Sequence, residues 1–159
     1  MWLGIPYKRK LSRVMMGANM RMLFIHCDYF SYLTTQPTKT AERIASGCKR
    51  CAFKDALVIF LTAEKYDEAD PDKVVEKGVQ EVTNVSKQVG AKDIVLFPFV
   101  HLSEQVGNSR IALQILSNLE KKLKLLNYSV DRAPFGWEKV FSLTSKGHPL
   151  AESSRTIRP

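Results

Sequence analysis

The sequence APFGWEKVFSLTSKGHPLAESSR, residues 133–155, predicts a β-strand, a turn and a second polar segment. Side chains alternate between the two faces of a strand, so one face carries, in order, Trp137, Lys139, Phe141 and Leu143. Burial of an ammonium group lowers its pKa unless a polar partner lies nearby, and His148 and Glu152 follow closely enough to supply one. Alternatively, Lys139 lies at the end of an edge strand and extends its amine into water.

Further strands are predicted on both sides of this segment. Runs of apolar and β-branched residues favour strands at residues 21–27, 29–35, 56–62 and 94–100. Asp28 is expected to close the first of these strands, and residues 37–50 are predicted to be a loop. Pro98 indicates that the last strand ends there or lies at an edge of the sheet.

Two amphipathic helices are predicted, at about residues 71–89 and 109–126. The first begins with Asp70 as N-cap, has a proline at its first position and stops at Gly90. Its Gly78 costs about 1 kcal/mol relative to alanine unless close packing requires it. Strands and helices in this order predict a single α/β domain in which two main helices cover a mixed β-sheet.

The composition is that of one globular domain. The chain has 159 residues and a net charge of +8, which favours a polyanionic partner such as RNA. No apolar run approaches the roughly 20 residues of a membrane-spanning helix, and three cysteines favour a reducing compartment, the cytoplasm. Residues 1–19 are interpreted as a basic extension, with disorder as one interpretation, and residues 20–159 as the domain. The basic residues at 43, 49, 50 and 54 either face RNA or belong to a solvated loop.

Two cysteine-based sites receive little support. Cys48 and Cys51 form a single CxxC pair without a second pair of ligands at zinc-site spacing, so free thiols are the favoured interpretation. Cys27 and His26 are adjacent on a predicted strand and therefore point to opposite faces. They are not expected to form a nucleophile and its base.

A third group of polar residues follows the ends of predicted strands. His101 comes directly after one strand, Lys139 lies in an apolar row, and His148 and Glu152 lie beyond the turn at Gly147. Sites in α/β sheets form where strands end. A lysine, a histidine and a glutamate can position a water, accept its proton and stabilise an oxyanion, which suits ester hydrolysis. In the simpler interpretation, the histidines belong to strand ends and turns, and Glu152 pairs with a surface cation.

These residues lie in segments that resemble the N-terminal editing domain of archaeal threonyl-tRNA synthetases. The similarity covers about residues 20 to 158 and is carried by MLFIHCDY at 22–29, AEK at 63–65, FPFVHLS at 97–103 and residues 133–157. It implies a fold similar to D-aminoacyl-tRNA deacylases, a homodimer, and hydrolysis of serine wrongly attached to threonine tRNA. Such a second sieve is needed because one methyl group provides only about 1–3 kcal/mol of discrimination.

The resemblance also implies the roles of individual residues. His101, Lys139 and Glu152 match catalytic positions around the substrate and the attacking water, with Lys139 as a fixed charge beside the ester. Positions that match the substrate-binding segments are Ala63, Glu64, Phe99, Val100, Trp137, Glu138 and His148. The implied partners are the 3′ end of threonine tRNA carrying serine and the catalytic part of a synthetase; no cofactor, metal or membrane is implied.

One departure keeps other functions open. Relatives often have an aromatic residue where this chain has Glu138. An acid there either weakens contact with the nucleotide or pairs with Lys139. A non-catalytic module that binds tRNA or a synthetase, and a D-aminoacyl-tRNA deacylase, are therefore the alternatives. The sequence does not distinguish a fragment of a synthetase from a unit that acts in trans.

Overall fold

The computed structural model describes residues 19–45 and 49–158, so residues 1–18 of the predicted extension lie outside the described part. The strands are β1 (Arg21–Pro37), β2 (Arg50–Thr62), β3 (Asp93–Pro98), β4 (Ser129–Arg132), β5 (Trp137–Ser145) and β6 (Glu152–Thr156). The helices are η1 (Lys65–Ala69), α2 (Pro71–Val89), η2 (Val100–Leu102) and α3 (Ser109–Leu125). No helix in this part of the chain is both long and apolar enough to span a membrane.

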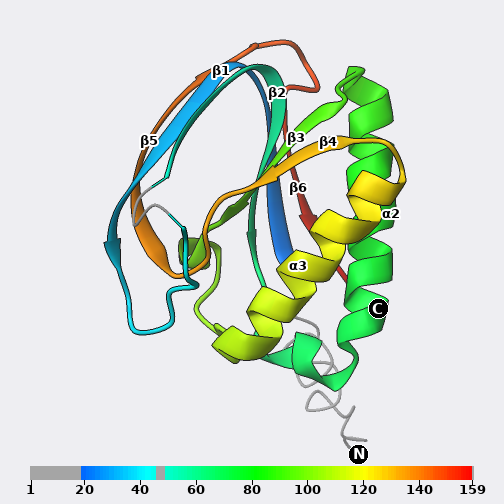
Figure 1. Ribbon diagram of the computed structural model, residues 1–159. Helices are drawn as coiled ribbons and strands as arrows, with labels where there is room; N and C mark the ends of the chain where they lie inside the picture. The colour runs from blue at the N-terminus through cyan, green and yellow to red at the C-terminus, as the bar shows by residue number, and fades with distance from the viewer. Residues whose placement is uncertain (1–18, 46–48, 159) are drawn as a thin grey trace, which may run out of the picture.

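The six strands form one mixed sheet in the order β4-β3-β2-β1-β5, and β6 also pairs with β1 (Figure 1). β2, β3 and β4 are parallel because α2 and α3 connect them as crossovers, whereas β1 is antiparallel to β2, β5 and β6. Both helices pack on the same face of the sheet and contact each other. The predicted α/β class, with a mixed sheet and two main helices, is confirmed.

Helix α2 begins and ends at the predicted residues. The side chain of Asp70 accepts a hydrogen bond from the Lys73 amide at 3.2 Å, and Gly90 closes the helix with φ of 73°. At Gly78, a Cβ atom would lie 3.0 Å from Cε of Met20 and 3.6 Å from Cε of Met22. The close packing that the sequence required of this glycine is therefore present, between α2 and the start of β1.

The prediction of two separate strands at 21–27 and 29–35 is wrong, because both belong to β1. Asp28 nevertheless marks a change within this strand. Phe24 packs on the helix face of the sheet, yet Phe30, which alternation would place on the same face, packs on the opposite one. β2 changes faces at the paired position, where Asp55 adopts φ of 52°. The two strands turn a corner together, and their far halves fold over the sheet with β5.

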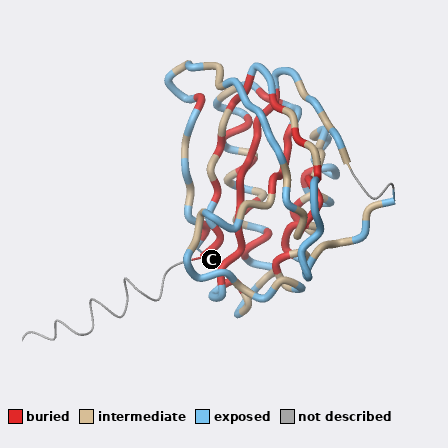
Figure 2. Tube along the Cα trace, turned by 90° about the vertical axis from the view of Figure 1, so that its left-hand side faces the viewer, coloured by how far each residue is buried: buried red, intermediate tan, exposed pale blue. Residues whose placement is uncertain are grey.

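The corner encloses a second, aromatic core. Phe30 lies 5.7 Å from Phe97 and 6.2 Å from Phe60, measured between ring centroids, both in edge-to-face geometry. Phe141 of β5 lies 5.2 Å from Phe97 on the same side. Figure 2 shows buried positions running along the central strands, with exposed positions on the outer strand and the turns. The sheet thus has helices on one face and its own curled edge on the other.

A polar network fixes the outside of this corner. Nζ of Lys146 lies 2.7 Å from Oδ1 of Asp28 and 3.1 Å from Oδ1 of Asp55. The Leu150 amide donates to Nδ1 of His148 at 3.2 Å, so Nε2 of His148 carries the proton that is donated to Nδ1 of His26 at 2.9 Å. His26 then donates from Nε2 to Asp55 at 3.2 Å. The network joins β1, β2 and the turn between β5 and β6.

This network predicts acid sensitivity of the fold. Burial lowers the pKa of His26 below its ordinary value of 6.5, against the opposing effect of Asp55 and with smaller lowering effects of Lys146 and His148. The unfolded chain therefore binds a proton more readily, and stability present above about pH 6.5 should be lost as the pH falls toward the folded-state pKa. Urea unfolding between pH 7.5 and 5 should show a smaller loss for His26→Gln than for the unchanged protein. The exposed His101→Gln is the matched control, and equal losses in all three proteins would contradict the prediction.

Candidate active site

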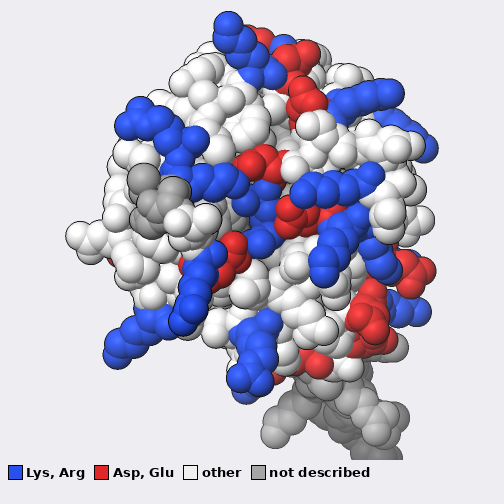
Figure 3. All heavy atoms as spheres, viewed as in Figure 1, with Lys and Arg blue, Asp and Glu red and all other residues white. Residues whose placement is uncertain are grey.

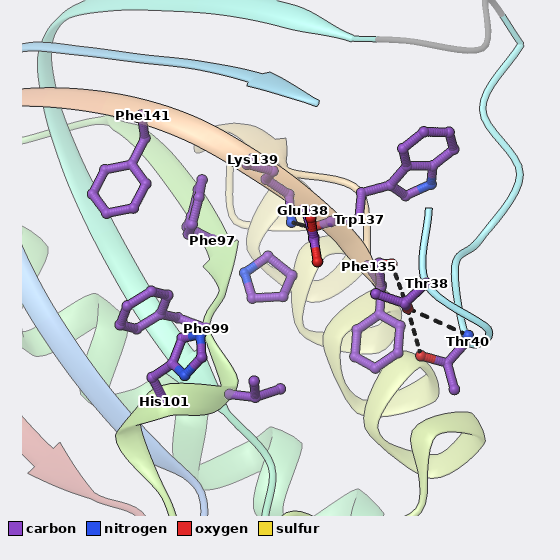
Figure 4. A pocket seen from close by; sticks show the side chains of 13 residues that line it. Thr38, Thr40, Phe97, Phe99, His101, Phe135, Trp137, Glu138, Lys139 and Phe141 are labelled. Atoms are coloured by element: carbon purple, nitrogen blue, oxygen red, sulfur yellow. Dashed lines mark hydrogen bonds between the residues drawn. The ribbon is translucent and has the colours of Figure 1, made fainter. Parts of the chain in front are cut away.

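A cavity of about 530 Å³ lies at the C-terminal end of β3, between that strand, the start of β5 and the segment after β1 (Figure 4). Its apolar wall includes Phe97, Phe99, Phe135 and Phe141, and Trp137 also lines it, although its indole points away toward the Glu42 carbonyl oxygen. Its polar groups are Thr38, Thr40, His101, Glu138 and Lys139. A cavity of this size with few polar groups is typical of a site for a small organic group.

Lys139 is the cation of this cavity. Its Nζ donates a hydrogen bond to the carbonyl oxygen of Trp137 at 2.8 Å and lies 5.1 Å from the ring centroid of Phe97. Burial lowers its pKa from 10.5 to about 8, with an opposing effect of Glu42. β5 is an edge strand, as one interpretation expected, but Lys139 borders the cavity instead of extending into open solvent.

Residues 38–42, here called the entrance loop, hold the start of β5 in place. Thr38 donates to the carbonyl oxygen of Gly136 from its amide at 2.9 Å and from its hydroxyl at 2.6 Å. The Glu42 amide donates to the Phe135 carbonyl oxygen at 3.0 Å, and the Trp137 indole donates to the Glu42 carbonyl oxygen at 2.8 Å. Gly136 has φ of 75°, and a Cβ atom there would lie 2.7 Å from Ala41 Cα. This close contact requires glycine three residues before the lysine.

His101 enters the cavity from η2. Pro98 ends β3, and the Phe99 amide donates to the Leu61 carbonyl oxygen at 2.9 Å, which starts the turn toward Val100. The imidazole of His101 is exposed and lies 5.1 Å from the Phe99 ring, centroid to centroid. The structure thus brings His101 and Lys139 to one cavity, together with Phe99, Val100, Trp137 and Glu138 of the predicted binding set.

Two smaller cavities adjoin the first. One of about 340 Å³ shares Thr40, Phe99, Val100 and Phe135 with it and is also lined by the predicted Ala63. The other, of about 370 Å³, shares His101 and is lined by the predicted Glu64. Glu64 is buried, and its Oε1 accepts a hydrogen bond from Nε of Arg21 at 2.6 Å.

Glu152 and His148 lie away from the cavity in the folded structure. Lys139 pairs with Thr34 of β1, whereas Glu152 pairs with Ile25, nine residues earlier, which is a path of about 30 Å along the strand. Glu152 accepts a hydrogen bond from the Ser145 hydroxyl at 2.7 Å, and His148 belongs to the corner network. Neither lines the cavity of Lys139, so one chain does not bring the four polar residues together.

The cysteines offer no alternative centre among the described residues. Burial raises the pKa of Cys27 to about 11, and both ring nitrogens of His26 bind other groups, so these two residues do not form a nucleophile and its base. Within residues 19–45 and 49–158, no group of three or more His, Cys, Asp or Glu side chains could hold a metal ion. Cys48 of the CxxC pair lies outside the described part, so the interpretation of this pair as free thiols instead of zinc ligands stays a prediction.

Sequence reasoning missed the entrance loop. Thr38 and Thr40 carry no motif that would connect them with a lysine about 100 residues later, and the contact arises only because β1 and β5 are paired. The aromatic wall of the cavity is only weakly indicated by the sequence. Phe97 and Phe99 alternate around Pro98, and Phe135 precedes Gly136, but their convergence on one cavity depends on the corner in β1 and β2.

Comparison with known proteins gives a consistent result. The family model described as the archaea-specific editing domain of threonyl-tRNA synthetase matches residues 20–157. Threonine–tRNA ligases of Thermococcus onnurineus and Thermococcus gammatolerans are 45% and 46% identical over 141 residues, and that of Methanosarcina barkeri is 43% identical over 140. Each match covers 88% of this chain but only 22% of the ligase, so the chain spans about a fifth of those relatives.

A solved structure shows the same fold. A probable eukaryotic D-amino acid tRNA deacylase superposes with a TM-score of 0.59 at 10% sequence identity. The match covers 87% of this chain and 100% of the other. The expectation of a fold similar to D-aminoacyl-tRNA deacylases is therefore confirmed.

Because its ammonium group is partly buried, Lys139 is expected to lower the free energy of unfolding. Its pKa of about 8 in the folded state, against 10.5, means that the unfolded chain holds the proton more tightly between these values. Lys139→Met should therefore raise the free energy of unfolding at pH 7 by about 1–3 kcal/mol, and this gain should shrink as the pH rises from 8 toward 10. Denaturant titrations at pH 7 and 9.5 measure both values. A destabilised methionine variant would contradict the assignment, and the exposed Lys87→Met on α2 is the control.

Proposed function

Because the chain belongs to the archaea-specific editing domain family of threonyl-tRNA synthetase, we propose that it is a proofreading deacylase that removes serine from threonine tRNA and spares threonine. The observation that carries this proposal is the cation in the aromatic cavity. Hydrolysis of an aminoacyl ester develops negative charge on the carbonyl oxygen, and a fixed positive group in a water-poor site stabilises it. Lys139, held by the Trp137 carbonyl oxygen, supplies a positive group of this kind at the cavity.

The cavity suits the terminal adenosine of a tRNA. Purine bases stack on aromatic rings, and four phenylalanine residues line this cavity. The neighbouring cavity of about 340 Å³, which shares lining residues with the first, offers a second compartment for the aminoacyl group. We assign the ester to the region where Lys139 and His101 border the larger cavity, because both charge stabilisation and proton transfer are available there.

His101 and Lys139 have different roles in this proposal. An exposed imidazole can accept a proton from an attacking water and release it to solvent. The ammonium group of Lys139 acts as a fixed charge, since its Nζ already donates a hydrogen bond to a carbonyl oxygen. The aromatic wall reduces the local dielectric constant, which strengthens the interaction between that charge and the oxyanion.

The first test is hydrolysis of seryl- and threonyl-tRNA for threonine, with a chelator present. The seryl ester should be hydrolysed faster than the threonyl ester, and Lys139→Ala should slow that reaction about 10²–10³-fold. Since the cation is the active form, the enzymatic rate should fall as the pH rises through about 8, after subtraction of spontaneous hydrolysis. Lys87→Ala, an exposed lysine on α2, should retain full activity.

Other outcomes of this assay distinguish the alternatives. Equal survival of both esters, with tRNA still bound, would leave a non-catalytic binding module, for which the exposed acid Glu138 at the cavity is the specific argument. Hydrolysis of D-aminoacyl-tRNA instead of seryl-tRNA would assign the other activity of this fold.

We also propose that the active form is a homodimer and that Glu152 acts from the second copy. β5 is an edge strand with three exposed apolar side chains, Val140 at 63%, Phe141 at 39% and Leu143 at 36%. Such an edge favours pairing with another chain. Glu152 is about 30 Å along β1 from the partner residue of Lys139, so a contribution of this carboxylate to the ester requires another chain.

Mixed dimers test this arrangement. Lys139→Ala and Glu152→Ala chains should each be inactive, whereas co-refolding them in equal amounts should restore about a quarter of the unchanged activity, because half of the dimers contain one complete site. Light scattering checks that dimers form. Full activity of Glu152→Ala alone, or no recovery in the mixture, would rule out a catalytic contribution from the partner's glutamate.

A further inference from the structure

The entrance loop and the residue after it carry charges that the catalytic proposal does not use. Thr38 and Thr40 line the cavity, so Lys39 between them lies at its rim, and Arg43 follows directly after the loop. Both side chains are exposed. The loop backbone is fixed to residues 135–137 by the hydrogen bonds of Thr38, Glu42 and Trp137. The two cations are therefore presented by a fixed segment next to the cavity.

The carboxylate of Glu42, in the entrance loop, points into the protein. Oε2 of Glu42 accepts a hydrogen bond from Nη1 of Arg132 at 2.7 Å, and Nε of the same arginine donates to Glu120 of α3 at 2.8 Å. The Glu42 side chain is only 18% exposed. Lys39 and Arg43 have no ion-pair partner within residues 19–45 and 49–158. The loop thus pairs its carboxylate inside and leaves its positive charges to the solvent.

Two cations on neighbouring elements are paired with acids. Lys49 lies 3.0 Å from Asp131, and Lys124 lies 2.9 Å from Glu120 on α3. Figure 3 shows this face of the molecule with basic and acidic side chains interleaved. Against this background, Lys39 and Arg43 are a local positive surplus next to the cavity, opposed by the exposed Glu138.

We propose that Lys39 and Arg43 bind phosphodiester groups of the single-stranded tRNA 3′ end and thereby guide its terminal nucleoside into the cavity. This inference rests on the proposed function and adds the nucleic-acid contact. Arginine binds phosphate with two parallel hydrogen bonds, and lysine acts as a point charge. Phosphate contacts fix orientation without reading sequence, which suits a 3′ end with a constant sequence.

The test compares a full and a minimal substrate. Lys39→Gln with Arg43→Gln should raise KM for seryl-tRNA and leave hydrolysis of 3′-O-seryl-adenosine unchanged, because the minimal substrate has no phosphodiester. Loss of two contacts to a single strand should reduce the slope of log KM against log salt by about 1.4. The ratio of the KM of the variant to that of the unchanged protein should then shrink about sevenfold between 50 and 200 mM salt.

The control is a pair of equal charge at the other end of the sheet. Lys87→Gln with Lys92→Gln also removes two exposed cations, near the start of β3, and should leave KM and its salt slope unchanged. An entrance variant with the KM and salt slope of the unchanged protein, or an equal effect of the control pair, would overturn the proposal. Equilibrium binding of the same tRNA applies this test without turnover, whereas failure to hydrolyse seryl-adenosine would count against the deacylase function itself.

Discussion

The corner at Asp28 and Asp55 is the constraint on which the remaining structure depends. At these paired positions the side chains of β1 and β2 switch from one face of the sheet to the other. Phe30 therefore packs against Phe60 and Phe97 instead of the helices. Asp55 is of a residue type that tolerates a left-handed conformation better than most, and its carboxylate is held there by His26 and Lys146. Lys146 reduces the repulsion between the two carboxylates by contacting both. Since β5 pairs with the far half of β1, the corner also decides where Lys139 lies.

The cavity and the aromatic core are parts of the same construction. Phe97 and Phe141 belong to the core that the corner encloses, and both also line the cavity beside Lys139. The lysine is therefore partly buried at the open end of an apolar layer, where its ammonium group loses hydration. Retention of a cation at such a position is the expected result when function opposes stability.

The sequence predicted the elements with local signals and missed those that depend on distant pairing. Asp70, Pro71 and Gly90 determined the ends of α2 because capping acts within one turn. The prediction that Asp28 ends the first strand is wrong, because alternation alone does not distinguish the end of a strand from a change of face within it. The motifs around His101 and Lys139 indicated one site, and the structure brings these two residues to one cavity. The entrance loop has no local signal, since its contacts with Gly136 join residues almost 100 positions apart.

The geometry of β5 also explains the surroundings of Glu138. This residue directly precedes Lys139 in β5 and lines the same cavity, but its side chain is exposed while Lys139 is partly buried. The carboxylate that raises the pKa of Lys139 is that of Glu42, in the entrance loop. An acid at position 138 is therefore compatible with a charged lysine in the cavity. The exposed carboxylate of Glu138 would repel the phosphates of a tRNA 3′ end that approaches the cavity from solvent. The positive charges of Lys39 and Arg43 would offset this repulsion.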